Sequence, residues 1–541
     1  MVNTDISGKG NVMTRRPVGR WMRVAMFAFV GALLLLPGAA GGADGKVFRW
    51  SFQSDVLTLD PYHNNETMTL GFLNNIYEGL VRRGKKMEIE PALATEWSTR
   101  GADVWRFKLR PGVKFHDGSP LTPEDVIFSY ERARSETSDI KPFVDGIKAV
   151  RKVDDHTIEI VTDGPRPILL NSIARWYIVP KAWFEKHNTV KVHKLGTAET
   201  NYATLHANGT GPFMIKTRQP DVQTVLVPNP GWWDRTEHNV SEAIFRPIKA
   251  DATRVAGLLS GELDMMYPVP LQDVARINNS GNVQVLQNPE VRTIFLGFDL
   301  HRDELLYSSV KGKNPFKDRR VRQAMYQAID IKAIREKVMF GASRPTALLI
   351  GPGITGFDPA LDQRLPHDVA ASKRLLADAG YPNGFDVTFD CPNDRYVNDE
   401  SICQAVTAML ARAGLKVRLN AQTKAKHFQK ITAKDTSFYL LGWTPASLDM
   451  HETFSYIAAT GSQWNCGGYS NPKVDGLLKE IATEVDPRKR QTLITEAMRL
   501  HKEDIGYLPL HQQALAWGVK RNVDVVQLGD NTFSLRWVRM Q

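Results

Sequence analysis

The feature that most restricts the fold of this chain is a strand–helix–strand succession in its second half. A short apolar strand pattern at residues 386–389 is followed by a helical pattern at 401–413, which Gly414 closes, and by a further strand pattern at 415–419. Glycine often ends a helix because it adopts the left-handed backbone conformation without a steric cost. A strand, a helix and a strand in this order are the signature of a βαβ unit. The sequence therefore predicts an α/β fold.

The next strand pattern, at residues 438–441, leads into a loop with the composition of a pocket wall. Trp443 follows this strand, and Thr444, Ser447 and Asp449 come within the next six positions. In doubly wound folds ligands collect where a strand leaves the sheet. An indole with polar neighbours provides an apolar wall and anchors for a bound solute. The alternative is a buried tryptophan at the end of a core strand, because most tryptophans belong to the core or its rim.

Strand and helix patterns alternate through the rest of the chain and change character near residue 295. The last strand patterns return to the β-rich character of the first half, so we expect two α/β regions and a C-terminal tail that joins the first. The other expected strands are 46–59, 104–109, 156–161, 213–218, 223–227, 293–298, 506–510 and 514–519. The other expected helices are 67–80, 123–134, 252–260, 318–337, 369–379, 474–482 and 488–503.

The first 43 residues have the composition of a secretory signal that is removed from the mature protein. An apolar run at 24–36 and small residues at 38–43 follow a positive segment that contains Arg15, Arg16, Arg20 and Arg23. The apolar run is shorter than the roughly 20 residues of a membrane-spanning helix, and a signal-anchor helix is the alternative. Cleavage is expected near Ala40 or Ala43, where no cysteine offers a lipid-attachment point. The sequence leaves the export route open.

Length, charge and cysteine content restrict the class of function. With 541 residues, two or three domains are expected. Loss of the signal removes five basic residues and one acidic residue, which lowers the net charge from +10 to +6. No block of basic residues is interleaved with aromatic ones, so nucleic-acid binding is not expected. The three cysteines, Cys391, Cys403 and Cys466, allow at most one disulfide within the chain and have no CxxC spacing for a metal.

Motifs of common enzyme classes are missing from the sequence. It contains no GxSxG, HExxH or Walker A phosphate-loop pattern. The glycine-rich stretch at 209–212 includes Pro212 and precedes no long helix, which is typical of a tight turn. The histidines are scattered, without carboxylates at metal-ligand spacing beside them. We therefore expect no enzyme, no catalytic residues, no metal and no cofactor.

A series of short motifs, spread in order over nearly the whole mature chain, carries a family resemblance. The motifs are LTLDP at 57–61, IYEGL at 76–80, FKLRPGVKFHDG at 107–118, LTPEDV at 121–126, GTGPF at 209–213, NP at 229–230, SGELD at 260–264, VRQA at 321–324 and AID at 328–330. Together they resemble the solute-binding proteins of peptide- and nickel-type ABC importers. This is the dipeptide- and oligopeptide-binding family, also called bacterial extracellular solute-binding protein family 5.

The resemblance implies an α/β, two-lobed periplasmic-binding-protein fold of type II, large cluster C, with two hinge crossings and an extra subdomain in lobe 1. The expected parts are a signal at 1–43, lobe 1 at 44–292 and 511–541 with its subdomain at about 86–205, lobe 2 at 293–510, and crossings at 293–298 and 508–510.

The implied function is that of the periplasmic substrate-binding component of an ABC importer. Such a protein acts as a monomer, captures a di- or oligopeptide or a peptide-like solute between its lobes, and delivers it to the inner-membrane permease. The same fold also serves non-peptide solutes, so an opine, a sugar, a nickel chelate or haem is the alternative. A third possibility is an enzyme or chaperone on this scaffold, for which the chain shows no nucleophile–base pair.

Site residues follow from the resemblance residue by residue. In the peptide-binding members of the family, an acidic residue commonly binds the amine of the ligand. It lies three positions after the tryptophan that matches Trp443, and here that position is Ala446. This departure favours a ligand without an ordinary free amine. Asp449 is the nearest acid and matches a structural acid of the same loop more closely, although we include it with Ser447 among the expected ligand-binding residues.

The remaining expected ligand-binding residues lie on other segments. Arg395, in a loop after a strand, is the candidate for a ligand carboxylate, and a surface loop charge is the alternative. Tyr62 and His63 follow the first strand and are expected on the opposite wall. His511 follows the second expected crossing, where the lobes meet.

Overall fold

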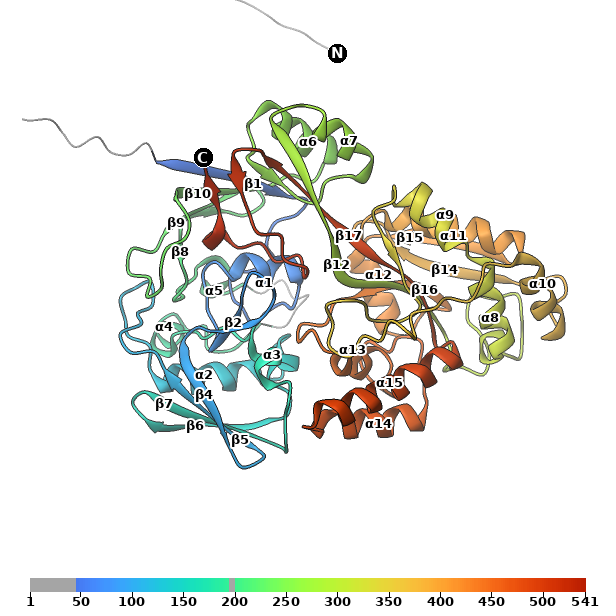
Figure 1. Ribbon diagram of the computed structural model, residues 1–541, viewed down its shortest axis with the longest axis horizontal. Coiled ribbons are helices and arrows are strands. Elements are labelled where there is room, and N and C mark those ends of the chain that lie inside the picture. The colour runs from blue at the N-terminus through green and yellow to red at the C-terminus, as the bar shows by residue number, and fades with distance from the viewer. Residues whose placement is uncertain (1–44, 194–199) are drawn as a thin grey trace, which may run out of the picture. The chain divides into compact units, whose positions relative to one another are not determined.

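The computed structural model describes residues 45–193 and 200–541 (Figure 1). The expected signal segment and its cleavage zone lie outside the described residues. Within the described ranges, none of the helices combines the length and the apolar composition that a membrane crossing requires.

One eleven-stranded sheet runs through the molecule and contains most of the strands. Its order is β15–β14–β16–β12–β17–β11–β1–β10–β9–β8, and β13 pairs with β17 at the side. The bounds are β1 Lys46–Phe52, β8 Phe213–Gln219, β9 Gln223–Pro228, β10 Val240–Pro247, β11 Met265–Met266, β12 Val283–Phe298, β13 Arg344–Pro345, β14 Asp386–Pro392, β15 Lys416–Gln422, β16 Phe438–Trp443 and β17 Tyr507–Lys520.

The antiparallel pair of β12 and β17 belongs to both halves of this sheet. It extends from Val283 opposite Lys520 to Gly297 opposite Tyr507. β12 also pairs with β16 at one end, whereas β17 pairs with β11 at the other. The register shifts between Pro289 and Thr293, where the regular ladder is interrupted. The crossings expected at 293–298 and 508–510 thus lie on the β16 side of this interruption, and β17 is one continuous strand instead of two.

The βαβ prediction for the second half is confirmed. β14 pairs in parallel with both β15 and β16. Helix α11, Asp399–Arg412, connects β14 to β15, and α12, Lys424–Thr432, connects β15 to β16. In this strand order the apolar strand β16 is buried. The ring of its first residue, Phe438, packs against the rings of Phe389 and Phe298 at centroid distances of 4.5 and 5.5 Å.

The C-terminal tail packs into the core of the first half, as its β-rich pattern predicted. The ring of Phe533 lies 5.8 Å from that of Trp50 on β1 and 5.9 Å from that of Trp517 on β17. One hydrophobic core therefore combines β1 with residues more than 460 positions later. The remaining short strands are β2 Val81–Arg83, β3 Ile89–Pro91, β18 Val523–Asp524 and β19 Arg539–Met540.

A separate four-stranded antiparallel sheet lies within the range expected for an extra subdomain. Its order is β4–β5–β7–β6, with bounds β4 Ala94–Arg100, β5 Val104–Leu109, β6 Ile147–Asp154 and β7 Thr157–Thr162. Helix α2, Pro123–Ala133, packs against β6 and begins where predicted. The Asp125 carboxylate accepts hydrogen bonds from Thr122 N at 2.8 Å and from its hydroxyl at 2.7 Å, which satisfies the first turn.

Two predicted helices end earlier than their apolar spacing suggests. The pattern at 318–337 forms α8, Arg319–Ala328, then α9, Ile331–Ala333, and a π-helical turn η4, Ile334–Val338. Asp330 separates them, because its carboxylate accepts a hydrogen bond from Ala333 N at 3.0 Å and starts a new turn. The pattern at 67–80 forms only α1, Thr67–Leu73; beyond it the Asn75 carboxamide oxygen accepts from Leu535 N at 2.7 Å.

The other helices agree with the predicted patterns or fill the connections between strands. They are α3 Leu169–Ile173, α4 Lys181–Lys186, α5 Tyr202–Leu205, α6 Asp251–Ser260, α7 Val274–Asn278, α10 Val369–Asp378, α13 Met450–Ile457, α14 Pro472–Thr483 and α15 Pro487–Asp504. Short 3₁₀ turns are η1 Lys141–Val144, η2 Leu271–Asp273, η3 Pro315–Lys317 and η5 Leu535–Trp537.

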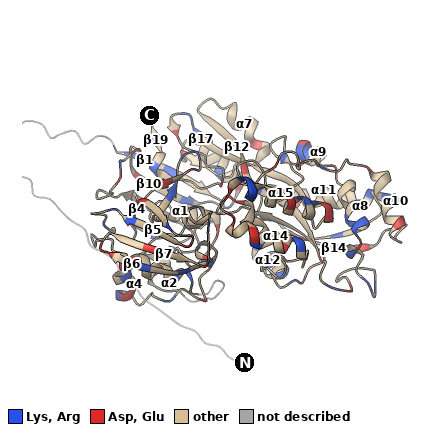
Figure 2. Ribbon diagram, turned by 60° about the horizontal axis from the view of Figure 1, so that its bottom comes forward, with Lys and Arg blue, Asp and Glu red and all other residues tan. Residues whose placement is uncertain are grey.

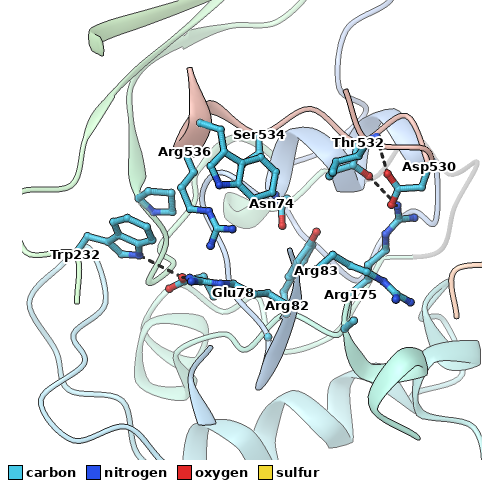
Figure 3. Close-up of a pocket in the computed structure, with 16 residues that line it drawn as sticks. Asn74, Glu78, Arg82, Arg83, Arg175, Trp232, Asp530, Thr532, Ser534 and Arg536 are labelled. Carbon is cyan, nitrogen blue, oxygen red and sulfur yellow. Dashed lines mark hydrogen bonds and ion pairs between the residues drawn. The ribbon is translucent and has the colours of Figure 1, made fainter. Parts of the chain in front are cut away.

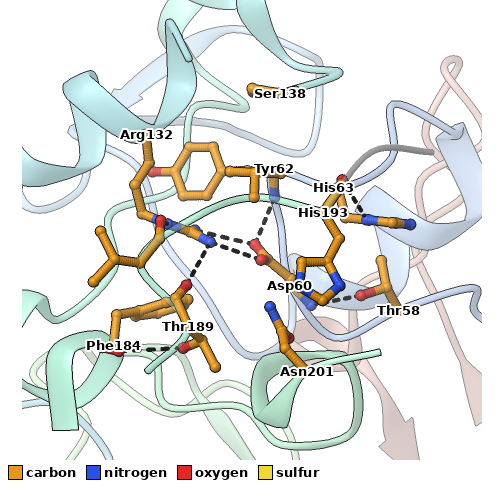
Figure 4. A network of polar contacts seen from close by, with 12 residues as sticks. Thr58, Asp60, Tyr62, His63, Arg132, Ser138, Phe184, Thr189, His193 and Asn201 are labelled. Carbon is orange, nitrogen blue, oxygen red and sulfur yellow. Dashed lines mark hydrogen bonds and ion pairs between the residues drawn. The ribbon is translucent and has the colours of Figure 1, made fainter. Parts of the chain in front are cut away.

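A buried ion pair joins the loop after β1 to helix α2 (Figure 4). Arg132 donates to both carboxylate oxygens of Asp60, at 3.1 and 2.7 Å, and to the backbone oxygen of Thr189 at 3.2 Å. Its guanidinium also lies between the rings of Tyr62 and Phe184, 4.9 and 4.2 Å from their centroids. Both charged side chains are at most 3% exposed, so the two charges depend on each other.

Replacing Arg132 by Leu should destabilise the first half of the protein strongly. The change leaves the Asp60 carboxylate buried without its partner, which costs about 3–5 kcal/mol in comparable cases. Urea unfolding followed by tryptophan fluorescence measures the loss. Arg106→Leu is the matched control, because Arg106 pairs with Glu159 at 2.7 Å near the surface and should cost less than about 1 kcal/mol. Equal losses in the two variants would contradict a stabilising role of the buried pair.

Candidate functional site

The loop after β16 presents an aromatic wall with unused hydrogen-bonding groups. The ring of Trp443 stacks on Tyr456 of α13 at 5.7 Å and lies 5.8 Å from Trp464. Its indole nitrogen and the Thr444 hydroxyl are shielded from water, yet neither has a hydrogen-bond partner among the described residues. The Ser447 hydroxyl is in the same situation. A buried polar group without a partner costs about 1–3 kcal/mol, so such a cluster suits a ligand that supplies the partners.

Asp449 holds this loop in place. Its carboxylate forms two hydrogen bonds with Arg490 of α15, at 2.8 and 2.9 Å, and also accepts from His451 N at 2.9 Å. Asp449 is completely buried. Both carboxylate oxygens of Asp449 thus serve the start of α13 and the ion pair, and a ligand contact of this residue stays a prediction.

Glu452 occupies the space next to the position where the family's acid is missing. Its two carboxylate oxygens accept hydrogen bonds from Ala446 N at 2.8 Å and Ser447 N at 2.6 Å. Burial raises the pKa of Glu452. On the other side, Arg83 of lobe 1 donates to the backbone oxygen of Ala446 at 3.3 Å. The loop thus lies directly against lobe 1.

Arg395 lies in a loop that is fixed at both ends. Cys391 at the end of β14 and Cys403 in α11 form a disulfide, which is the pairing that the sequence left open, and Cys466 is free and buried. The Asp399 carboxylate accepts from the backbone nitrogens of Arg395 and of the next residue, both at 2.9 Å. These contacts hold the Arg395 backbone in place.

Tyr396 joins the Arg395 loop to the Trp443 loop. Its hydroxyl accepts from Gly442 N at 2.9 Å and donates to Gly442 O at 3.2 Å, directly before Trp443. The structure therefore brings Arg395 to the same end of the β14–β16 pair as Trp443, Thr444 and Ser447. We call these four residues, with Arg292 and Glu66 described next, the interlobe site.

Arg292 and Arg395 form a cationic pair beside this wall. Their guanidinium carbons lie 5.9 and 5.2 Å from the ring centroid of Tyr396. Arg292, near the register shift of β12, donates from Nε to Glu290 at 3.1 Å. Burial lowers the pKa of Arg292, although Glu290 opposes this. The guanidinium of Arg395 donates no hydrogen bond to any residue that the structure describes, so it can take an anionic group.

Lobe 1 contributes Glu66 to the same region. Its carboxylate forms an ion pair with Lys424 of α12 at 2.8 Å, which is a direct contact between the lobes. Burial alone would raise the pKa of Glu66, but Lys424 and then Arg395 lower it below its usual value. Arg292, Arg395 and Lys424 thus lie near the carboxylates of Glu66 and Glu290, and Asp394 and Asp399 belong to the same loop as Arg395. The guanidinium of Arg395 has no carboxylate in hydrogen-bonding contact among the described residues, so it suits a carboxylate on the solute.

The structure places Tyr62 and His63 in contacts within lobe 1. The Tyr62 hydroxyl is buried and donates to the Tyr177 oxygen at 2.5 Å, and His63 contacts the His193 oxygen at 2.9 Å through Nδ1 (Figure 4). Both residues belong to the surroundings of the Asp60–Arg132 pair. His511 is completely buried in β17, opposite Ile294, and both of its ring nitrogens lack a hydrogen-bond partner among the described residues. The ligand contacts expected for Tyr62, His63 and His511 stay predictions.

Two residues of the interlobe site were missed in the sequence. Arg292 could have been found, because Glu290 and Arg292 interrupt an otherwise apolar strand pattern. Glu66 gave no such signal, because it precedes an ordinary helix start and acquires its role only through contact with Lys424. Within the described ranges, no three His, Cys, Asp or Glu side chains are grouped so as to hold a metal ion.

The buried position of His511 makes the stability of the protein depend on pH. Burial lowers the pKa of His511 to about 3, and Arg364 contributes in the same direction. An unfolded chain protonates this imidazole near pH 6.5. Because the unfolded state takes up the proton first, stability is present above about pH 6.5 and is lost as the pH falls toward 3. The loss is at most ~1.4 kcal/mol per pH unit for this group.

His511→Gln should therefore flatten the pH dependence of stability. Between pH 6 and 4.5 the free energy of unfolding of the variant should fall less steeply than that of the wild type, by ~1 kcal/mol per pH unit. Urea unfolding at four pH values measures both slopes. His156→Gln, at an exposed turn, is the control. If the His511 variant keeps the wild-type slope, the imidazole is not buried in its neutral form.

Comparisons with known proteins identify relatives and solved structures with the same fold. A glutathione-binding protein (GsiB) of Salmonella typhi is 24% identical over 485 residues, which cover 87% of this chain and 90% of that protein. The periplasmic binding protein AgaA of A. tumefaciens R10, solved with agropinic acid, shares the fold with a TM-score of 0.78 and 23% identity, covering 92% of this chain and 99% of AgaA. A dipeptide-binding protein of Pseudoalteromonas sp. SM9913, solved with Met-Leu, has a TM-score of 0.79 and 20% identity, covering 92% and 100%.

The two-lobed type II fold of cluster C, predicted from the motifs, is confirmed by these structures. The model of the family described as bacterial extracellular solute-binding proteins, family 5 (middle region), matches residues 88–465. This match spans well over half of the chain, and the protein belongs to family 5 of the bacterial extracellular solute-binding proteins.

Proposed function

We propose that this protein captures a peptide-like solute that carries a carboxylate and releases it to an inner-membrane ABC permease. The observation that carries the proposal is the group of donors without partners in the interlobe site. The Trp443 indole nitrogen is buried without an acceptor, and the Arg395 guanidinium lacks an acceptor among the described residues. Both requirements are met by a solute with an amide or carbonyl group next to a carboxylate.

The relatives support this class of solute. Their names and structures associate them with glutathione, with the dipeptide Met-Leu and with agropinic acid. All three are acids built on amino acids or their derivatives. A carboxylate that meets Arg395 and Arg292 would form charge-assisted hydrogen bonds, which are roughly twice as strong as neutral ones.

Binding would act by shifting the lobes toward a closed state. A solute that contacts Trp443 of lobe 2 and the Glu66 segment of lobe 1 interacts with both lobes only when they are closed, so it favours that state. The Glu66–Lys424 ion pair already crosses between the lobes and would assist closure. We infer that the permease recognises the closed protein, on the periplasmic side of the membrane and after signal cleavage near Ala40 or Ala43.

An opine-type acid is the second candidate, and Ala446 is the observation that favours it. A free amine of a peptide needs a carboxylate at this loop, but position 446 has none and Glu452 is already bound to two backbone nitrogens. A solute whose nitrogen is acylated, as in an amide or a lactam, carries no positive charge there and does not need such an acid. A nickel chelate or haem would instead leave bound metal in the purified protein, which elemental analysis detects.

Trp443→Ala should weaken binding of the solute by more than about tenfold, which is roughly 1.4 kcal/mol, because the indole supplies both the wall and a donor. The solute is first identified by mass spectrometry of what co-purifies, and its affinity is measured by calorimetry. Trp97→Ala, on β4 of the separate sheet, is the matched control and should leave affinity unchanged. Unchanged affinity in the Trp443 variant, together with a loss of stability, would mean that Trp443 is only a core residue.

Arg395→Gln should discriminate between solutes with and without a free carboxylate. A panel of dipeptides, their C-terminal amides and opines is tested by thermal shift and calorimetry. Affinity for the free acids should fall at least tenfold in the variant, because a hydrogen bond to a charged group contributes about 1.5–3 kcal/mol, and affinity for the amides should not change. Arg412→Gln, exposed at the end of α11, is the control. If the wild type binds amides as well as acids, the carboxylate proposal is wrong.

A further inference from the structure

The short hairpin of β2 and β3 is a projection of lobe 1 that has had no part in the proposed function so far. Its strands pair from Val81 opposite Pro91 to Arg83 opposite Ile89, and the turn between them spans 84–88. In this turn Met87 has a φ of 68°, the left-handed conformation that residues other than glycine seldom adopt. Such a conformation persists where the surrounding contacts favour it, and it often marks a functional position.

Ion pairs hold the base of the hairpin on lobe 1. Arg82 of β2 pairs with Asp234 at 2.5 Å and, across the hairpin, with Glu90 of β3 at 3.3 Å. Consecutive residues of a strand point to opposite faces, so the next residue, Arg83, is directed away from this anchor. Figure 3 shows the side chains of Arg82 and Arg83 pointing in opposite directions from β2. The hairpin is thus a fixed part of lobe 1 with one arginine directed elsewhere.

Arg83 connects the hairpin to the Trp443 loop of lobe 2. Its guanidinium donates to Met87 O at 2.9 Å and to Asn171 Oδ1 at 3.1 Å, both of which belong to lobe 1. It also donates to the backbone oxygen of Ala446 at 3.3 Å, in the loop that carries the unpartnered hydroxyls. The first two contacts hold the guanidinium on lobe 1, and the third makes it part of the wall where the two lobes meet.

Apolar contacts close the same place. The Met87 side chain packs against a hydrophobic cluster of lobe 2, which includes Leu441, Leu448 and the Trp443 ring. Within the described ranges, the other side chains of this cluster all come from 291–507. In the opposite direction, Ala446 of lobe 2 packs against the hydrophobic core of lobe 1. Each lobe thus places an apolar side chain against the core of the other, and protein atoms fill the space beside Ala446.

A second contact between the lobes lies at the Arg395 end of the interlobe site. Lys424 pairs with Glu66 of lobe 1 at 2.8 Å, and its backbone nitrogen donates to the carboxylate of Asp394, directly before Arg395, at 2.5 Å. The Arg395 and Trp443 loops leave the adjacent parallel strands β14 and β16, and neighbouring strands lie about 4.8 Å apart. Contacts between the lobes therefore lie at both ends of a short site.

We propose that the β2–β3 hairpin is the end wall of the interlobe site and restricts the solute to a dipeptide or an acid of similar length. This inference rests on the proposed function and narrows it, because it excludes oligopeptides. An extended chain adds about 3.3 Å per residue, so a solute with its carboxylate at Arg395 reaches the Trp443 loop within a few residues. A longer solute has to displace Arg83 and Met87 from their contacts with lobe 2, which weakens its binding relative to a short one.

The test measures how affinity depends on the length of the solute. Two series of alanine peptides of two to five residues, one with a free and one with an acetylated N-terminus, are titrated into the full mature protein by calorimetry. We expect the four-residue peptides to bind about tenfold more weakly than the two-residue peptides, or weaker still.

The double variant Arg83→Ala/Met87→Gly removes the wall. Glycine adopts the left-handed conformation without a steric cost, so the turn of the hairpin is preserved. The ratio of the affinities for two- and four-residue peptides should fall by about tenfold in this variant, even where the loss of contacts between the lobes weakens both. Lys85→Ala is the matched control, because Lys85 lies in the same turn but pairs with Glu237 of lobe 1 at 2.6 Å, and it should keep the wild-type ratio.

Equal affinity of the wild type for short and long peptides would overturn the proposal, and so would a double variant that keeps the wild-type ratio. If the double variant does not fold, Met87→Gly alone should lower the ratio, and an unchanged ratio has the same meaning. Trp443→Ala should weaken binding of every length, so the proposed function is judged separately. If the wild type binds no alanine peptide, the co-purified solute decides: one longer than a tripeptide overturns the length limit, and a shorter one supports it.

Discussion

The antiparallel pair of β12 and β17 is the constraint on which the rest of the structure depends. Backbone hydrogen bonds along this pair connect the strands of both halves into one sheet. The ladder is interrupted between Pro289 and Thr293, where a proline cannot donate, and its register shifts again between Ile294 and Phe295. A rotation of the lobes therefore needs changes of backbone angles at a few residues and leaves each half-sheet intact.

Charged side chains lie at this interruption, where a core strand would normally be apolar. Glu290 accepts from Gln513 of the neighbouring strand and from Arg292, and all three are buried. Under the proposed function, a solute carboxylate at Arg292 would contact the hinge directly. The same residues would then bind the solute and shift the hinge toward the closed state, so no longer chain of contacts is needed between the ligand site and the hinge.

How much of this follows from the sequence depends on how local each feature is. The βαβ unit, the start of α2 at Thr122 and the glycine end of α6 at Gly261 were predictable, because each depends on a few neighbouring residues. The break after α8 was not, because Asp330 competes with an apolar spacing that continues through it. The disulfide partner of Cys391 likewise became clear only when β14 and α11 were placed side by side.

The candidate site divides in the same way. Trp443 was predictable because it ends an apolar strand, and the motifs identified its loop, but Asp449 was assigned to the ligand although its partner Arg490 lies 41 residues further on. Tyr62 and His63 were assigned to a pocket wall from their place after β1, whereas contacts with residues more than 100 positions away direct them into lobe 1. A sequence gives the chemical type of a polar residue. Only the tertiary contacts decide whether its hydrogen-bonding and ion-pairing groups are already bound to other residues of the protein.

The distribution of arginine partners shows where such groups remain available. Basic and acidic residues lie interspersed along the chain (Figure 2), and surface arginines are paired with nearby acids, as Arg499 is with Glu496 at 2.7 Å and with Glu503 at 2.6 Å. In the interior, Arg132 and Arg490 have carboxylates, and Arg322 has backbone oxygens. Arg395 departs from this rule, because its guanidinium donates no hydrogen bond to a described residue, and it lies at the same end of the β14–β16 pair as the unpartnered donors of the Trp443 loop. A guanidinium in this position gains a carboxylate partner when an anion arrives from outside the chain, so the fold leaves Arg395 available for a ligand.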